Sequence, residues 1–339
     1  MQFTDKLKAL TIPLRNWHKA IFGDMDKKIT KFEEEIKKND DLVSNGVYDG
    51  TMEARRKALV TYCERWYVRK KIYWKQLSRS QQANEMDKNT RYFHNIASAR
   101  RRNNRIDTLS INGRLVRNQA RIKLAIKEYY NDLYHRDNSH MMAFRDGLVS
   151  RIEQEDSVNL EALPTAEEIR KAVWDCESSK APGYDGYNMN FIKRCWGEIG
   201  SEFTAAVMGF FQSSRLPSDC NITWVALAPK FIRVREIKDL HPISMFGCIY
   251  KVISKVLVRR MRLVMPVLVG ETQSAFVKGR KLHDRALIEC ETVNWLKVRK
   301  KEAAIIKLDF QKAYDRVKWS FVEIVLQKMG FGQRWMMSG

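Results

Sequence analysis

Hydrophobic positions recur with helical spacing along most of residues 1–64. Between Asp24 and Asp40, acidic and basic side chains alternate around Ile29, Phe32 and Ile36, which share one helical face. A turn rich in Asn, Asp and Gly follows at 45–50, and helical spacing resumes over 53–77. The pattern predicts two helices joined by a turn.

The next stretch is polar and basic, and the pattern over 78–120 predicts an extended or irregular arm. Within it, Asn112 and Gly113 separate two short apolar runs, as in a two-residue β-hairpin turn. Helical spacing returns over 119–135. The arm is therefore expected to carry one small hairpin and to end at a helix.

From Leu163 onward, β-branched runs alternate with helical patterns. Thr165 is the expected N-cap of a helix, and Glu168 three residues later completes a capping box. A loop is expected at 180–188, helices at 189–214, 246–264, 284–300 and 318–329, and strands at 222–228 and 303–310. The alternation predicts an α/β domain, so that the fold class of the whole chain is α+β or α/β.

The charge of the chain is concentrated rather than spread evenly. The 339 residues carry a net charge of +21, and residues 65–127 hold 17 Lys and Arg against 3 Asp and Glu. Such an excess favours a polyanionic partner. No apolar run is long enough to span a membrane, and no signal peptide or CxxC pair is present. We expect reduced cysteines and an intracellular protein of the nucleus or cytoplasm, not a secreted one.

Aromatic and basic side chains are interleaved through the basic stretch, where cations can pair with phosphates and aromatic rings can stack on bases. The alternative is an exposed basic helix whose aromatic side chains pack in the protein core, as we expect for Trp66, Tyr73 and Trp74. The expected nucleic-acid contacts are Arg79, Arg91, Arg100, Arg101, Arg102 and Arg105.

The sharpest chemical signal is Asp309, at the end of the apolar strand expected over 303–310. A carboxylate held at a strand end can face a cleft and bind Mg²⁺, which takes few protein ligands besides phosphates and water. Asp315 follows six residues later and is expected to cap a helix or form an ion pair. A capping role is open for Asp309 as well.

The segment KLDFQKAYDRVKW (307–319) closely resembles the first catalytic motif of LINE-type non-LTR retrotransposon reverse transcriptases, of the kind found in plants. Four further segments resemble motifs of that family in the same order, namely WKQLSRSQQANEMDKNTRYFHNIASARRRNNRI (74–106), KAPGYDGYNMNFIKRCW (180–196), WVALAPK with DLHPIS (224–230 and 239–244) and QSAFVKGRKLHD (273–284). The resemblance implies the fingers and an incomplete palm of a right-hand polymerase, preceded by a helical basic extension. The implied divisions are 1–64 (helical segment), 65–160 (basic RNA-binding linker) and 161–339 (fingers and partial palm).

The resemblance also implies residue roles. Asp309 and the carbonyl of Phe310 would bind Mg²⁺, with Mn²⁺ as an alternative, and Tyr314 would exclude a 2′-hydroxyl, although it could equally be a core aromatic. Lys230 would contact the triphosphate beside His241, which replaces the family's arginine, although a lysine in this position is often merely solvated.

For Gly183, Gly186 and Arg280 the resemblance implies nucleic-acid contacts, with an ordinary turn and a surface arginine as the alternatives. The implied partners are an RNA template, a DNA primer and deoxynucleoside triphosphates. No Ala/Asp-Asp motif follows Asp309 within the 339 residues, so that we expect no polymerase activity from this chain alone. A non-catalytic RNA-binding role is the alternative.

Overall fold

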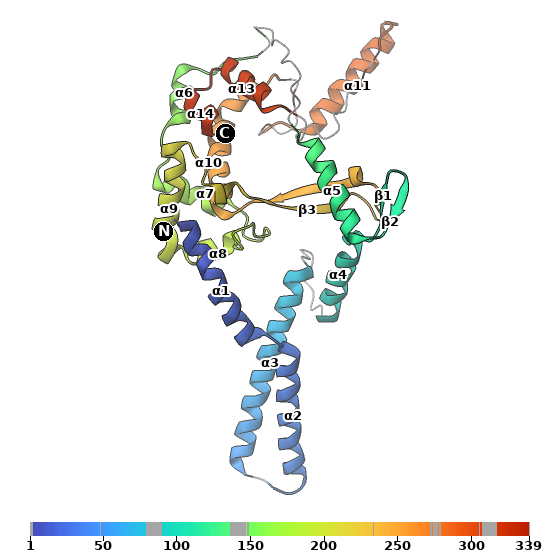
Figure 1. Cartoon of the computed structure of the whole chain (residues 1–339), viewed down its shortest axis with the longest axis vertical. Helices are drawn as coiled ribbons and strands as arrows, with labels where there is room; N and C mark the ends of the chain where they lie inside the picture. The colour runs from blue at the N-terminus through green and yellow to red at the C-terminus, as the bar shows by residue number, and fades with distance from the viewer. Residues whose placement is uncertain are drawn as a thin grey trace. The chain divides into compact units, whose positions relative to one another are not determined.

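A computed structural model describes residues 3–47, 49–78, 90–135, 147, 149–232, 234–271, 273, 277, 279–304, 306 and 317–338. The chain forms two compact units. We call residues 9–123 and 227–242 the arm unit, and residues 1–8, 124–226 and 243–339 the core unit. The chain passes between them within α1 (Phe3–Phe22), α5 (Gln119–Leu133), β3 (Trp224–Pro229) and β4 (Leu240–Met245), where β3 and β4 are neighbours in one sheet (Figure 1).

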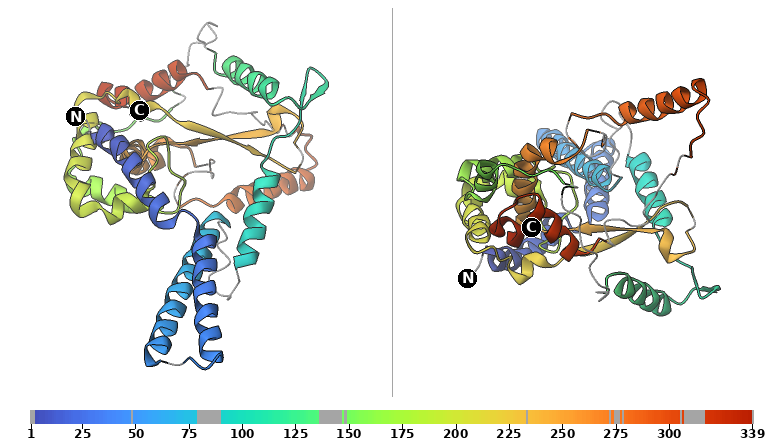
Figure 2. Two further views of the ribbon diagram at one scale, coloured as in Figure 1. Left: turned by 60° about the horizontal axis from the view of Figure 1, so that its bottom comes forward. Right: turned by 90° about the horizontal axis from the view of Figure 1, so that it is seen from above.

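A helical hairpin of α2 (Met25–Ser44) and α3 (Gly50–Ser78) forms much of the arm unit, and the two helices lie side by side in Figures 1 and 2. Asp24 caps α2 by accepting a hydrogen bond from the backbone nitrogen of Lys27 at 3.1 Å. A small core of Ile29, Cys63 and Trp66 joins the helices, and the other expected face residues, Phe32 and Ile36, pack against it. The predicted helical pair is confirmed.

The expectation of an extended or irregular segment over 78–120 was wrong for its middle part. Residues Thr90–Asn103 form a helix, α4. The side chain of Phe93 is only 1% exposed, and the ring of His94 lies 4.4 Å from that of Trp74 on α3. Burial against α3 therefore stabilises a helix that the local polar composition did not indicate.

The predicted hairpin is present as β1 (Leu109–Ile111) and β2 (Arg114–Val116), with Leu109 opposite Val116. Asn112 and Gly113 both have positive φ, at 51° and 77°. These angles suit the tight turn that joins two right-handed twisted strands, and Asn and Gly tolerate them best. The backbone nitrogen of Ser110 also donates to the carbonyl of Arg235 at 2.6 Å, which ties the hairpin to the connection between β3 and β4.

The core unit is built around α7 (Ala166–Asp175), α9 (Trp196–Ser213) and α10 (Cys248–Leu268), which pack together in Figures 1 and 2. The side chains that meet there are fully buried, among them Ile169, Val173, Phe203, Val207, Val252 and Val256. A second cluster joins the far end of α10 to α6 (Gln154–Glu161) and α14 (Gln333–Ser338) through Leu160, Val264, Leu268 and Trp335.

Two helix predictions need refinement. Thr165 caps α7 as expected, with its hydroxyl 3.1 Å from the backbone nitrogen of Glu168. The Glu168 carboxylate instead accepts two hydrogen bonds from Arg260 at 2.9 and 2.7 Å, so that it pairs with α10. The helix expected over 189–214 is divided at Cys195 into α8 (Met189–Arg194) and α9.

The remaining elements are the 3₁₀ turns η2 (Ser218–Asn221) and η3 (Ile237–Asp239) and the helices α11 (Leu282–Val298) and α13 (Trp319–Lys328). Of the strand expected over 303–310, the described positions 303, 304 and 306 are not in a strand, and the others lie outside the described residues. All six cysteines are free thiols. Among the described residues, no helix combines the length and apolar character that a bilayer crossing requires.

Candidate functional site

The loop 180–188, one of the expected nucleic-acid contacts, is held against the start of α10 by Asp185. Its carboxylate accepts hydrogen bonds from the backbone nitrogen of Cys248 at 2.6 Å and from that of Tyr187 at 3.3 Å. Cys248 is the first residue of α10, so that the acid satisfies a free N–H group and places negative charge at the positive end of the helix. Asp185 is therefore a helix cap supplied by a distant segment.

The two glycines of this loop have different roles. A Cβ atom on Gly183 would overlap the carbonyl of Phe246 and lie 2.5 Å from the nitrogen of Gly247, so that only glycine allows this approach to α10. Gly186 has φ +80° and open space where its Cβ would lie, so that its requirement is conformational. The close approach at Gly183 is to protein backbone, and the nucleic-acid contacts expected of both glycines stay predictions.

Further contacts fix the same loop. The Tyr187 hydroxyl donates to the carbonyl of Leu7 in α1 at 2.9 Å, and Lys251 donates to the carbonyl of Ala181 at 3.0 Å. The Cys248 thiol donates to the Tyr187 carbonyl at 3.3 Å, and burial, aided by the nearby Asp185 charge, raises the pKa of this thiol. The thiol is thus a buried packing group and not a nucleophile.

Lys230 and His241, the expected triphosphate contacts, lie in the arm unit where β3 and β4 are neighbours. The backbone nitrogen of Lys230 donates to the carbonyl of Asp239 at 3.1 Å, and His241 follows two residues after Asp239. Both side chains are exposed. This contact therefore brings a cation just after β3 and an imidazole on β4 to neighbouring segments in solvent, where an anionic ligand could reach them.

Arg280, an expected template contact, is engaged with protein backbone. Its guanidinium donates to the carbonyls of Gly270, Gln273 and Val269 at 2.6, 2.7 and 3.0 Å. Val269 is the C-cap of α10, so that the arginine places donors and positive charge at the negative end of that helix. Its contact with a template stays a prediction.

Of the arginines expected to bind nucleic acid, those that the structure describes lie on and just after α4, and their side chains are exposed. Arg100 donates to the carbonyl of Ser78 at 2.6 Å at the end of α3, and Arg105 pairs with Asp107 at 2.6 Å. Arg91, Arg101 and Arg102 form no ion pair with the residues that the structure describes. They are thus available to phosphates. Of the aromatic residues expected in the core, Trp66 is buried at 9% exposure, whereas Tyr73 is 41% exposed.

Four of the predicted site residues, Arg79, Asp309, Phe310 and Tyr314, lie outside the described residues. Within the described ranges, no group of three or more His, Cys, Asp or Glu side chains could hold a metal ion. The predicted metal position therefore rests on Asp309 and on the chemistry of a carboxylate and a carbonyl, which are the oxygen ligands that Mg²⁺ takes.

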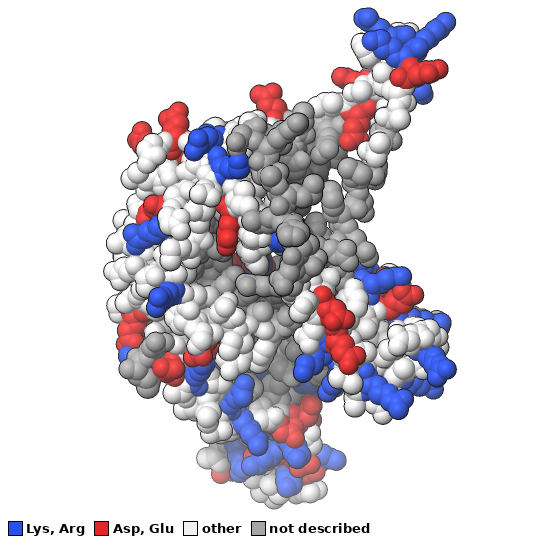
Figure 3. All heavy atoms as spheres, turned by 45° about the horizontal axis from the view of Figure 1, so that its top comes forward, with Lys and Arg blue, Asp and Glu red and all other residues white. Residues whose placement is uncertain are grey.

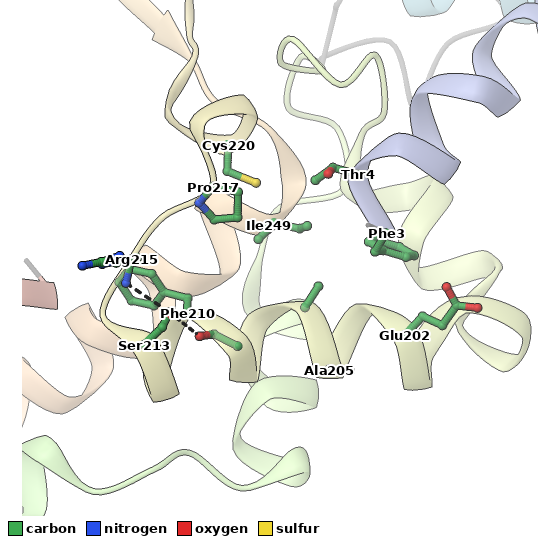
Figure 4. A pocket seen from close by; sticks show the side chains of 12 residues that line it. Phe3, Thr4, Glu202, Ala205, Phe210, Ser213, Arg215, Pro217, Cys220 and Ile249 are labelled. Carbon is green, nitrogen blue, oxygen red and sulfur yellow. Dashed lines mark hydrogen bonds between the residues drawn. The ribbon is translucent and has the colours of Figure 1, made fainter. Parts of the chain in front are cut away.

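Two other surface features of the core unit lack the groups of a catalytic or metal site. A hollow of about 390 Å³ lies between the first turn of α1, α9 and residues 215–220 (Figure 4). Its walls are largely apolar, and its one carboxylate, Glu202, pairs with Lys6 at 2.6 Å. The end of α11 gathers basic side chains (Figure 3), and Arg299 and Lys301 lie 5.3 and 4.9 Å from the ring centre of Trp295. Neither feature offers an acid–base pair or a set of metal ligands.

Sequence reasoning did not identify Asp185 as the residue that organises the loop, because its partner Cys248 lies 63 positions away. The only local signal was an acid between two glycines. Such a signal is common to ordinary turns and does not name a distant partner.

Residues 230–338 match the family model described as reverse transcriptase (RNA-dependent DNA polymerase). Over 263 residues, 76% of its length, the chain is 26% identical to the Transposon TX1 uncharacterized 149 kDa protein of Xenopus laevis and covers 20% of that protein. Over 161 residues, 45% of its length, it is 24% identical to the Retrovirus-related Pol polyprotein from type-1 retrotransposable element R1 of Bradysia coprophila and covers 15% of it. The chain thus spans a fifth or less of the length of these relatives.

Proposed function

Because the chain is a non-LTR retrotransposon reverse transcriptase segment, as its motifs predicted, we propose that it is the part of an RNA-directed DNA polymerase that holds template, primer and nucleotide. The observation that carries the proposal is the family match over 230–338, which includes Lys230, His241 and Asp309. The basic arm, α4 and the residues up to Arg105, supplies cations outside that range.

At the nucleotide site, Asp309 would bind a divalent cation through its carboxylate and Phe310 through its carbonyl. Reverse transcriptases depend on such a metal, and we assign Mg²⁺, with Mn²⁺ as an alternative. When bound, the ion neutralises charge on the reacting phosphates. Tyr314 would occupy the space of a ribose 2′-hydroxyl and thereby favour deoxynucleotides.

Lys230 would contact the triphosphate as a point charge. The imidazole of His241 cannot reproduce the forked contact of the guanidinium that it replaces. His241→Arg should therefore raise nucleotide affinity.

For nucleic acid, the exposed arginines of α4 would pair with backbone phosphates with little regard to sequence. Each phosphate contact releases counterions, so that affinity should fall steeply with salt. Arg91, Arg101 and Arg102 are the leading contacts, since Arg100 and Arg105 already have protein partners. The intracellular location expected from the sequence stays a prediction.

The 339 residues alone would not extend a primer, because Asp309 is the only carboxylate in them that matches a catalytic motif of the family. One carboxylate does not hold the two ions that stabilise the attacking and leaving oxygens. A non-catalytic RNA-binding role is the second candidate, and the exposed cations of α4 favour it.

A binding assay and a primer-extension assay on the same protein test the proposal. We expect salt-sensitive binding of a primer–template, no extension, and Mg²⁺-dependent binding of a deoxynucleoside triphosphate that Asp309→Ala abolishes without weakening RNA binding. Lys230→Ala should weaken only the nucleotide. RNA binding with no nucleotide binding at any Mg²⁺ concentration would favour the second candidate. Clear Mg²⁺-dependent synthesis would refute the expected inactivity.

A further inference from the structure

A hollow of about 490 Å³ in the arm unit is lined by the end of α1, the start of α2 and α3. Figure 1 shows where these three helices meet. His18 and Phe22, one turn apart on α1, line one side, and Arg69, Tyr73 and Gln76, which share a face of α3, line the other. The volume falls within the range of about 300–1,000 Å³ that small-molecule sites occupy.

The walls of this hollow are aromatic, and their rings contact further aromatic rings. His18 stacks on Phe22 with ring centres 5.2 Å apart, and Tyr73 packs edge-on against Trp74 at 5.4 Å. Trp74 in turn contacts His94 of α4 at 4.4 Å. The contact with Trp74 holds the Tyr73 ring in place, and the ring, at 41% exposure, remains available for stacking.

The polar groups around the hollow suit a nucleotide rather than an apolar ligand. The Arg69 guanidinium lies over Phe22 at 5.6 Å and over Trp66 at 4.7 Å, which holds an exposed cation at the rim. Gln76 adds hydrogen-bonding groups that could meet the edge of a base, and the two carboxylates of the lining, Asp24 and Asp26, already pair with Lys27 and Lys70. Trp74, which lines the hollow, contacts His94 of α4, the helix that carries Arg91 and Arg100 to Arg102.

We propose that this hollow binds one unpaired nucleobase of the single-stranded RNA or DNA whose backbone the arginines of α4 hold. Tyr73 would stack on the base and Arg69 would contact the adjoining phosphate. The inference rests on the proposed nucleic-acid binding of the arm and adds a specific base-binding subsite to it. Stacking tolerates any base, so that the site would favour unpaired over paired strands without reading sequence.

Helix α3 supplies a matched control. Tyr62 lies on the same face three turns earlier, is 51% exposed, and has Arg65 at 5.6 Å from its ring, yet it does not line the hollow. We therefore compare Tyr73→Ala with Tyr62→Ala, and Arg69→Ala with Arg65→Ala, in the full chain. Tyr73→Phe tests whether the ring alone suffices.

The probe is a fluorescent single-stranded RNA in which one abasic position is moved along the oligonucleotide. We expect Tyr73→Ala to weaken binding of the intact RNA by about 5- to 160-fold, the range for loss of one stacked base, whereas Tyr62→Ala and Tyr73→Phe change it less than about twofold. One abasic position should weaken binding to the wild type but not further to Tyr73→Ala, because the two changes remove the same contact.

The outcomes separate the two proposals. If the wild type binds no RNA, the proposed nucleic-acid binding of the arm fails. If it binds RNA, but Tyr73→Ala equals Tyr62→Ala or the abasic penalty is the same in both proteins, the base-binding subsite is wrong and the arm proposal stands. Circular dichroism of each variant shows whether α3 is retained. If Tyr73→Ala unfolds, the Arg69 and Arg65 variants decide, because the subsite requires Arg69→Ala to weaken RNA binding more than Arg65→Ala does, and equal losses would contradict it.

Discussion

Replacing Asp185 with alanine should loosen the first turn of α10. The substitution removes the acceptor of the Cys248 N–H, which lies in a residue with 0% exposure, and removes a negative charge from the helix N-terminus. Leaving a buried donor unsatisfied costs about 1–3 kcal/mol, and losing the charge costs roughly 0.3–1 kcal/mol more. The expected total of roughly 1.5–4 kcal/mol corresponds to about a tenfold to several-hundredfold rise in opening of that turn.

Hydrogen exchange read by mass spectrometry measures this directly, in peptides that cover the start of α10. Asp185→Asn keeps one oxygen acceptor for the Cys248 N–H and should lose the charge contribution together with the longer bond from the Tyr187 nitrogen, which the other carboxylate oxygen accepts. Asp219→Ala is the matched control, since it breaks the ion pair with Lys8. The side chains of Asp219 and Lys8 are 34% and 38% exposed, and ion pairs exposed to this degree contribute only about 0–1 kcal/mol. The cap argument fails if exchange at the start of α10 is the same in Asp185→Ala as in Asp219→Ala.

Three further predictions follow from single contacts. Gly183→Ala should lower the urea midpoint far more than Gly186→Ala, because the first change overlaps the backbone of α10 and the second meets only an unfavourable φ of +80°; equal losses would contradict this. Arg280→Ala should destabilise the chain by about 1–3 kcal/mol in urea, and Arg280→Lys should recover only part of this, because an ammonium cannot reproduce the fork to three carbonyls. The hydrogen bond to Glu33 raises the pKa of Tyr67 to about 12. The contribution of this bond to stability is therefore complete below the unfolded pKa of about 10 and is lost as the pH rises through about 12. The absorbance titration of the wild type minus that of Tyr67→Phe should give the raised pKa of Tyr67, and Glu33→Ala should return that pKa toward about 10.

The elements that the sequence predicted best depend on neighbours within a few positions. The hairpin at Asn112 and Gly113 follows from two residues that tolerate positive φ, and the cap at Thr165 follows from a hydroxyl within reach of the third amide beyond it. The stripe of Ile29, Phe32 and Ile36 likewise predicts the packing of α2 on α3. In each case the predictive pattern lies within a short stretch of chain, although the partners of the α2 stripe, Cys63 and Trp66, lie on α3.

The features that were missed depend on distant partners. Helix α4 is stabilised by burial of Phe93 against α3, which no local pattern contains. The candidate site shows the same limit. Family resemblance identified Gly183 and Arg280 as important, but the partners that the structure gives them, Phe246 and Val269, are not evident from their motifs. Resemblance to a family thus suggests the role of a residue but does not identify the contacts that position the residue.

Helix α10 links two of the motifs that the resemblance assigned to nucleic acid. Asp185, in the 180–188 loop, accepts from its first amide, and Arg280, in the 273–284 segment, donates to the carbonyls of Val269 and Gly270 just after its last turn. Acid at the amino end and base at the carboxyl end are the signs that the helix dipole favours. Loss of either residue would therefore disturb the helix before any contact with a ligand is considered. A variant such as Val256→Ala, which removes a fully buried side chain from the middle of α10, supplies the comparison. Val256→Ala shows how far RNA or nucleotide affinity falls when α10 is destabilised without loss of a contact. Arg280 would be assigned a direct contact with the template only if Arg280→Ala lowers the affinity further than Val256→Ala does at an equal loss of stability.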